Sequence, residues 1–78
     1  MDVRGRVIET LSELLQVPPG QLTDTTLLVE DLGVSSLDRF ELVMGLEDKF
    51  GIEMLEVDQD KIKSIGDIVG YVEARVTS

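Results

Sequence analysis

The stretch from Gly33 to Gly51 limits the possible folds of this chain more than any other. Gly33 tolerates a positive φ and suits a turn that leads into a helix. Ser35 and Asp38, three positions apart, match a capping box, in which two side chains bind the first free amides of a helix. Gly51 is a typical helix terminator. The stretch therefore predicts a helix over residues 36–50 with Ser36 at its N-terminus, where a phosphate group would be electrostatically stabilised.

The apolar residues of this predicted helix divide into two faces at about 100° per residue. One arc should face a core and holds Leu42, Val43, Leu46 and Phe50. The opposite arc combines large apolar groups with carboxylates and holds Leu37, Phe40, Glu41, Met44, Glu47 and Asp48. An apolar centre with a charged rim is typical of a transient protein interface. The alternative is that the preceding loop partly covers any one of the three apolar side chains.

Two further residues of this helix fall in unusual places. Arg39 lies on the core arc, and we expect its charged end to extend past the bundle into water. Gly45 costs about 1 kcal/mol relative to alanine in a helix interior. It would permit close approach by a partner or by a neighbouring helix, or it is a tolerated substitution.

The other segments also follow helical spacing, and strand-like alternation is missing from the sequence. An apolar stripe predicts a helix over residues 3–16, which ends before Pro18. We expect residues 21–34 to form a loop anchored to the core by its leucines, and residues 58–62 to form a short helical turn. Ser64 and Asp67 repeat the capping pattern before a last stripe over residues 65–72. The sequence therefore predicts an all-α fold, a small bundle of three longer helices plus one short helix.

Charge and composition exclude several classes of function. The chain has 78 residues and a net charge of −9, without cysteine or histidine. Disulfides, thiolate metal sites and imidazole catalysis are therefore excluded. Residues 24–60 hold eleven acidic and two basic side chains, which accounts for the whole imbalance. Such a surface repels nucleic acid and anionic membranes and attracts basic protein partners, although acidic surfaces also simply aid solubility.

A calcium loop beginning at Asp58 is also excluded. An EF-hand requires glycine at its sixth position and glutamate at its twelfth, which are Lys63 and Val69 here. We therefore expect no metal site. The sequence shows no signal peptide or membrane span, so we expect a cytoplasmic protein.

Three short motifs carry a resemblance to a known family. The run from Asp31 to Leu37, the run Glu41-Leu42-Val43-Met44 and the run Phe50-Gly51-Ile52 resemble acyl carrier proteins, and the similarity extends from about residue 11 to residue 72. The resemblance implies a single acyl-carrier-protein-like domain over residues 1–78, a four-helix bundle. It also implies that the serine before Leu37, which is Ser36, carries a covalent 4′-phosphopantetheine arm derived from coenzyme A.

The function that the resemblance implies is that of a carrier, with no enzymatic activity of its own. Acyl intermediates would be held as thioesters on the arm and delivered to enzymes of fatty acid, polyketide or related lipid biosynthesis. The expected partners are a carrier protein synthase (a phosphopantetheinyl transferase) and acyl-processing enzymes with basic docking patches, which would bind the mixed face of the helix over residues 36–50. The carrier would be a monomer, and a sequestered acyl chain would lie among residues such as Leu46 and Ile62.

Two alternatives remain open at this level. A peptidyl or aryl carrier protein uses the same arm and helix, and a non-modified helical interaction module would keep the fold without using Ser36. The chain also departs from the family at one position, since the family motif reads Asp-Ser-Leu where this chain has Ser35-Ser36-Leu37. Serine caps a helix about as well as aspartate. It supplies no negative charge beside the arm, so we expect weaker recognition by a general-purpose transferase.

Overall fold

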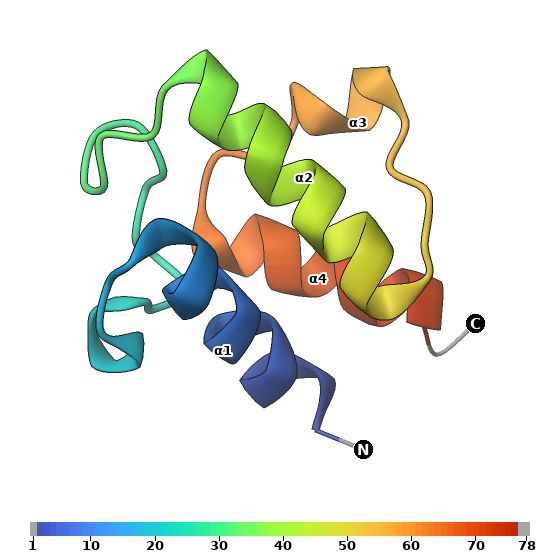
Figure 1. Ribbon diagram of the computed structural model, residues 1–78, viewed down its shortest axis with the longest axis horizontal. Coiled ribbons are helices and arrows are strands. Elements are labelled where there is room, and N and C mark those ends of the chain that lie inside the picture. Colours follow the sequence, from blue (N-terminus) through green and yellow to red (C-terminus); the bar gives the residue numbers. More distant parts are fainter. Residues whose placement is uncertain (1, 77–78) are drawn as a thin grey trace.

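Residues 2–76 are described by the computed structural model, and their secondary structure is helical. The elements are α1 (Val3–Leu15), the short 3₁₀ helix η1 (Pro19–Gln21), α2 (Ser36–Phe50), α3 (Glu56–Gln59) and α4 (Ile65–Val76). Helices α1, α2 and α4 pack around the core, with the short α3 at the edge of the bundle (Figure 1). The predicted all-α bundle of three longer helices and one short helix is therefore confirmed.

Local signals at the helix ends account for where α1 and α2 begin and end. The carboxylate of Asp2 accepts a 3.0 Å hydrogen bond from the Gly5 amide, which caps α1. Helix α2 starts and stops where the sequence predicts, at a capping box and at Gly51, whose φ is 64°. Helix α1 ends at Leu15, and its C-cap residue Gln16 adopts a left-handed φ of 57° without being glycine.

Helix α4 is capped by the predicted pair Ser64 and Asp67. The Ser64 hydroxyl accepts a 3.1 Å bond from the Asp67 amide, and the Asp67 carboxylate accepts bonds from the amides of Lys63 and Ser64. The Lys63 amide, and after it the Ser64 groups, lower the pKa of Asp67, although partial burial opposes them. Because the pKa is lowered in the fold, this contribution to stability is complete above the ordinary aspartate pKa. It is lost as the pH falls through the lowered value.

The remaining helix bounds differ somewhat from expectation. Helix α3 spans Glu56–Gln59, earlier than the predicted residues 58–62, because Leu55 is extended and Glu56 opens the first turn. Acidic residues such as Glu56 and Asp58 favour that N-terminal turn. Helix α4 continues to Val76, one turn past the predicted apolar stripe.

The core confirms the predicted inner arc of α2. Leu42, Val43 and Leu46 are buried, and Phe50 is half-buried with the Arg6 guanidinium 5.5 Å from its ring centroid. The most completely buried side chains of the described residues come from α1, α2, α4 and the long loop, and they are Leu11, Leu28, Leu42, Leu46, Ile65, Ile68, Val7 and Val72.

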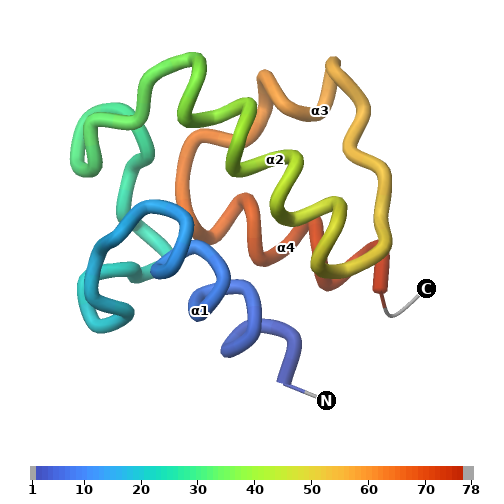
Figure 2. Tube along the Cα trace, in the orientation of Figure 1, coloured from blue at the N-terminus to red at the C-terminus, as the bar shows by residue number. Residues whose placement is uncertain are grey.

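The long connection between α1 and α2 lies on the side of the bundle away from both chain ends (Figure 2). Its backbone is joined to the start of α4: the Ile65 amide donates to the Thr26 carbonyl at 2.9 Å, and the Gly66 amide donates to the Asp24 carbonyl at 3.0 Å. The Leu28 amide donates in return to the Lys63 carbonyl. The loop therefore satisfies amides that a helix N-terminus leaves unpaired. Of its predicted anchors, Leu22 and Leu28 are buried, Leu32 is partly buried, and Leu27 is exposed.

Gly66 and Gly70 provide a matched test of this loop contact. A methyl group on Gly66 would lie 2.9 Å from the Asp24 carbonyl oxygen, whereas one on Gly70 would have no described neighbour within 4 Å beyond its own helix. We expect Gly66→Ala to lower the free energy of unfolding by about 1–3 kcal/mol, since backbone must move. Gly70→Ala should raise it by up to about 1 kcal/mol through helix propensity. Urea unfolding measures both, and equal effects of the two substitutions would contradict the loop contact.

Candidate functional site

Ser36 is the first residue of α2, and its side chain is exposed. The capping role falls to its neighbour: the Ser35 hydroxyl accepts a 3.1 Å hydrogen bond from the Asp38 amide, and the Asp38 carboxylate accepts one of 3.1 Å from the Ser35 amide. Both halves of the predicted capping box are therefore formed. As a result, the Ser36 hydroxyl is not needed to cap the helix that presents it.

The turn before Ser35 is fixed by the loop. Val34 is buried, and its amide donates a 2.9 Å bond to the Leu28 carbonyl. Gly33 precedes it with the predicted positive φ of 67°, and its amide donates to the Val29 carbonyl. The helix start is thus attached to the core two residues before the exposed hydroxyl. This places Ser36 on a rigid element, at the end of α2 where the helix dipole favours negative charge.

The outward face of α2 is exposed as predicted. Leu37 is 66% exposed, Phe40 57% and Met44 52%, so the preceding loop does not bury them. Glu41 and Asp48 are exposed beside them. The face therefore has an apolar centre and an acidic rim, the combination expected of a transient protein interface.

Glu47, also predicted for this face, has a structural contact. It is half-buried, and its carboxylate accepts a 2.8 Å hydrogen bond from the Met54 amide, which holds the segment that leads to α3. The sequence gives little signal for this bond because the two residues are seven positions apart across the turn at Gly51. Glu41 and Asp48 are consequently the better probes of docking.

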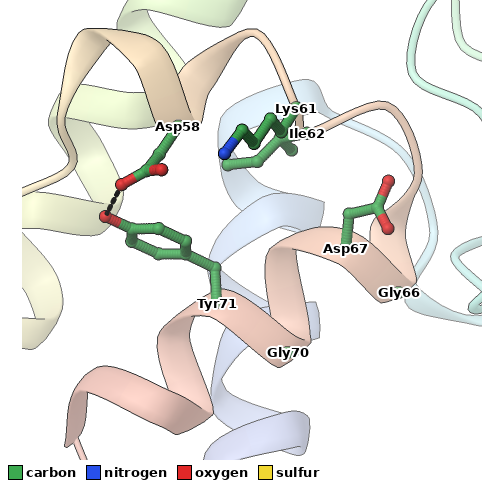
Figure 3. A pocket seen from close by; sticks show the side chains of 7 residues that line it. All are labelled: Asp58, Lys61, Ile62, Gly66, Asp67, Gly70 and Tyr71. Atoms are coloured by element: carbon green, nitrogen blue, oxygen red, sulfur yellow. Dashed lines mark hydrogen bonds between the residues drawn. The ribbon is translucent and has the colours of Figure 1, made fainter.

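The pair predicted to surround an acyl chain lies in the core. Leu46 and Ile62 are both buried and belong to the same hydrophobic cluster. Ile62 also lines a hollow of about 340 Å³ between α4 and the segment that contains α3, whose lining residues are Asp58, Lys61, Ile62, Gly66, Asp67, Gly70 and Tyr71 (Figure 3). This hollow takes no side chain from α2, the helix that carries Ser36.

A polar cluster that the sequence analysis missed fixes α3 to α4. The Tyr71 hydroxyl donates a 3.0 Å bond to the Asp58 carboxylate, which also pairs with Arg75 at 3.5 Å (Figure 3 shows the first bond). The Arg75 guanidinium lies 4.7 Å from the Tyr71 ring centroid. These contacts join residues 13 and 17 positions apart, and α3 buries none of its own side chains.

Comparison with known proteins decides the family. The model of the phosphopantetheine attachment site family matches residues 5–72 of this chain. The acyl carrier protein of Thermotoga maritima is 39% identical over 75 residues, covering 96% of this chain and 93% of that protein. The chain belongs to the acyl carrier protein family.

Further relatives agree with this assignment. The acyl carrier protein of Wolinella succinogenes is 46% identical over 73 residues, covering 94% of this chain and 96% of that protein. A solved structure from Mycobacterium tuberculosis that is assigned as an acyl carrier protein superposes with a TM-score of 0.87 at 33% identity, covering 94% of this chain and 97% of that one.

Family membership has direct consequences. It implies a covalently attached 4′-phosphopantetheine group, as predicted. Members of the family are carriers and not catalysts, and they work with synthases and acyl-processing enzymes.

Within residues 2–76, no helix combines the length and apolarity needed to cross a bilayer.

The division of roles between the two serines can be measured. We expect Ser35→Ala to lower the free energy of unfolding by about 1 kcal/mol, because it removes the acceptor for the Asp38 amide. Ser35→Asp should preserve it, since aspartate caps equally well. Ser36→Ala should have almost no effect. Thermal unfolding of the three variants without the arm tests this, and an equal loss for Ser35→Ala and Ser36→Ala would contradict it.

Proposed function

We propose that Ser36 is the attachment residue, and that the chain carries acyl groups as thioesters on the arm held there. The observation that supports this most is the pairing of an exposed Ser36 hydroxyl with a neighbouring Ser35 that already caps the helix. The site fits the group, because a phosphodiester on Ser36 would lie at the positive end of α2. Attachment would form a bond from the Ser36 oxygen to a phosphorus of coenzyme A, with loss of the serine proton and departure of adenosine 3′,5′-bisphosphate.

The arm supplies a thiol, which the chain itself lacks. The residues of the chain position the arm, because Val34 and the capping box fix the start of α2. The partner enzymes carry out the chemistry on the cargo. This positioning raises the effective concentration of the acyl group at each partner's active site. We place the chain in fatty acid, polyketide or related lipid biosynthesis, supported by the acyl carrier protein names of its relatives. A peptidyl carrier is the second candidate, on the same arm.

We further propose that partners dock on the outward face of α2. The centre of the contact would consist of three apolar side chains on one helix face, each more than half exposed: Leu37, Phe40 and Met44. Glu41 and Asp48, with Glu47 next to them, would meet basic side chains and steer association. The segment around α3 exposes two more apolar side chains, Leu55 and Val57.

Attachment is tested by intact mass after incubation with coenzyme A and a carrier protein synthase. The native chain should gain one phosphopantetheine, and peptide mapping should locate it on Ser36. Ser36→Ala should gain none, while Ser35→Ala, the matched control one residue away, should still be modified. Modification of Ser35 instead would overturn the assignment, and an unmodified native chain would favour a non-modified interaction module.

Docking is tested with Glu41→Lys and Asp48→Lys, which reverse charge on the outward face. Each should slow association with the synthase and flatten its dependence on salt, as expected for rim charges, with less than about 0.5 kcal/mol change in stability. Glu13→Lys, an exposed acid on α1, is the matched control and should behave like the native chain apart from the change in net charge. If all three variants associate alike, the outward face of α2 is not the docking surface.

A further inference from the structure

A groove lies beside the first turn of α2. Its volume is about 430 Å³, and the side chains that line it come from the long loop, from α2 and from the turn after α3; they are Leu27, Val29, Glu30, Arg39, Asp60 and Lys63. The apolar part of its wall comes from the loop, and the charged part contains two bases and two acids. A groove with this lining suits a ligand with both polar and apolar groups better than it suits a plain hydrocarbon chain.

Arg39 connects this groove to the attachment residue. It follows Ser36 by three positions, so the two side chains are neighbours on the helix surface, with Cβ atoms about 5–6 Å apart. A helical side chain lies over the turn N-terminal to its own Cα, which for Arg39 is the turn that begins at Ser36. The side chain is half-buried and lines the groove.

The charge distribution makes Arg39 unusual. Between Asp24 and Asp60 the only bases are Arg39 and Lys49, and Lys49 lies in the last turn of α2, at the opposite end from Ser36. Glu30 and Asp60 line the same groove, but no ion pair of Arg39 is formed within residues 2–76. A guanidinium keeps its charge at every physiological pH and binds phosphate oxygens well.

We propose that Arg39 is a positioning residue that pairs with the phosphodiester on Ser36 and directs the arm into the groove. This inference rests on the proposed attachment at Ser36. The pair would be partly exposed, so it would favour the groove-bound arm by only about two- to fivefold. Such a bias suits a carrier, because a partner can withdraw the arm without breaking a strong contact. Glu30 and Asp60 would compete for the guanidinium and keep the pairing reversible.

The first experiment uses the native chain with and without the arm. The chain has four arginines, Arg4, Arg6, Arg39 and Arg75, so each side-chain Nε–H signal can be followed by NMR and three serve as internal controls. Attachment should shift the Arg39 signal most, and added salt should reverse that shift as it screens the pair. An Arg39 signal that moves no more than the other three would overturn the proposal.

The second experiment compares Arg39→Gln with Lys49→Gln, which removes the same charge at the far end of α2. The ³¹P shift of the attached phosphodiester should depend on salt in the native chain and in Lys49→Gln. It should lose most of that dependence in Arg39→Gln, with the equilibrium constant for groove binding of the arm falling about two- to fivefold. Equal salt dependence in all three proteins would overturn the role of Arg39.

Intact mass separates this inference from the function on which it rests. A native chain that gains phosphopantetheine without either NMR response retains the proposed function and loses only the role of Arg39. A native chain that gains none removes both. If Arg39→Gln itself is not modified, the Nε–H comparison in the native chain decides the question by itself.

Discussion

The position of Ser36, the proposed attachment residue, depends on backbone hydrogen bonds between the long loop and the start of α4. Amides of Ile65 and Gly66 donate to loop carbonyls, and the Leu28 amide donates back to Lys63. These bonds satisfy helix amides that would otherwise need water, and they allow Leu28 to be completely buried. The Leu28 carbonyl in turn accepts from Val34, two residues before Ser36. A contact with the last helix therefore fixes the start of α2.

The two serines divide the roles of capping α2 and, as we propose, of holding the arm. A hydroxyl that caps its own helix is occupied by a backbone amide, so modifying it would cost the cap. Here Ser35 and Asp38 satisfy each other's amides, and Ser36 is left at the first helical position. If Ser36 holds the arm, the cost of serine at position 35 is electrostatic instead, because a hydroxyl contributes no charge next to it.

Features that depend on neighbours within one helical turn could be predicted from the sequence. The bounds of α2, the caps at Ser35 and Ser64 and the two faces of α2 all follow from spacings of three or four residues. Contacts between distant segments could not be predicted, and these include the Glu47–Met54 bond and the cluster around Asp58. The sequence left open why Gly45 is in mid-helix. A methyl group there would lie 2.7 Å from the end of the Leu14 side chain, so α1 approaches α2 closely at this point and alanine would require Leu14 to move.

The two faces of α2 differ in their contribution to stability. Leu42, Val43 and Leu46 are the residues of this helix that the core buries, and Phe50 packs against them partly exposed. Leu37, Phe40 and Met44 gain little from folding while more than half exposed, and exposed apolar groups of this size favour association. Stability therefore does not explain them, whereas the proposed docking would. Glu47 contributes to both, since its carboxylate accepts a hydrogen bond from the Met54 amide and its residue borders the proposed docking face. A substitution there would therefore change stability together with the proposed docking, whereas the exposed Glu41 and Asp48 can separate the two.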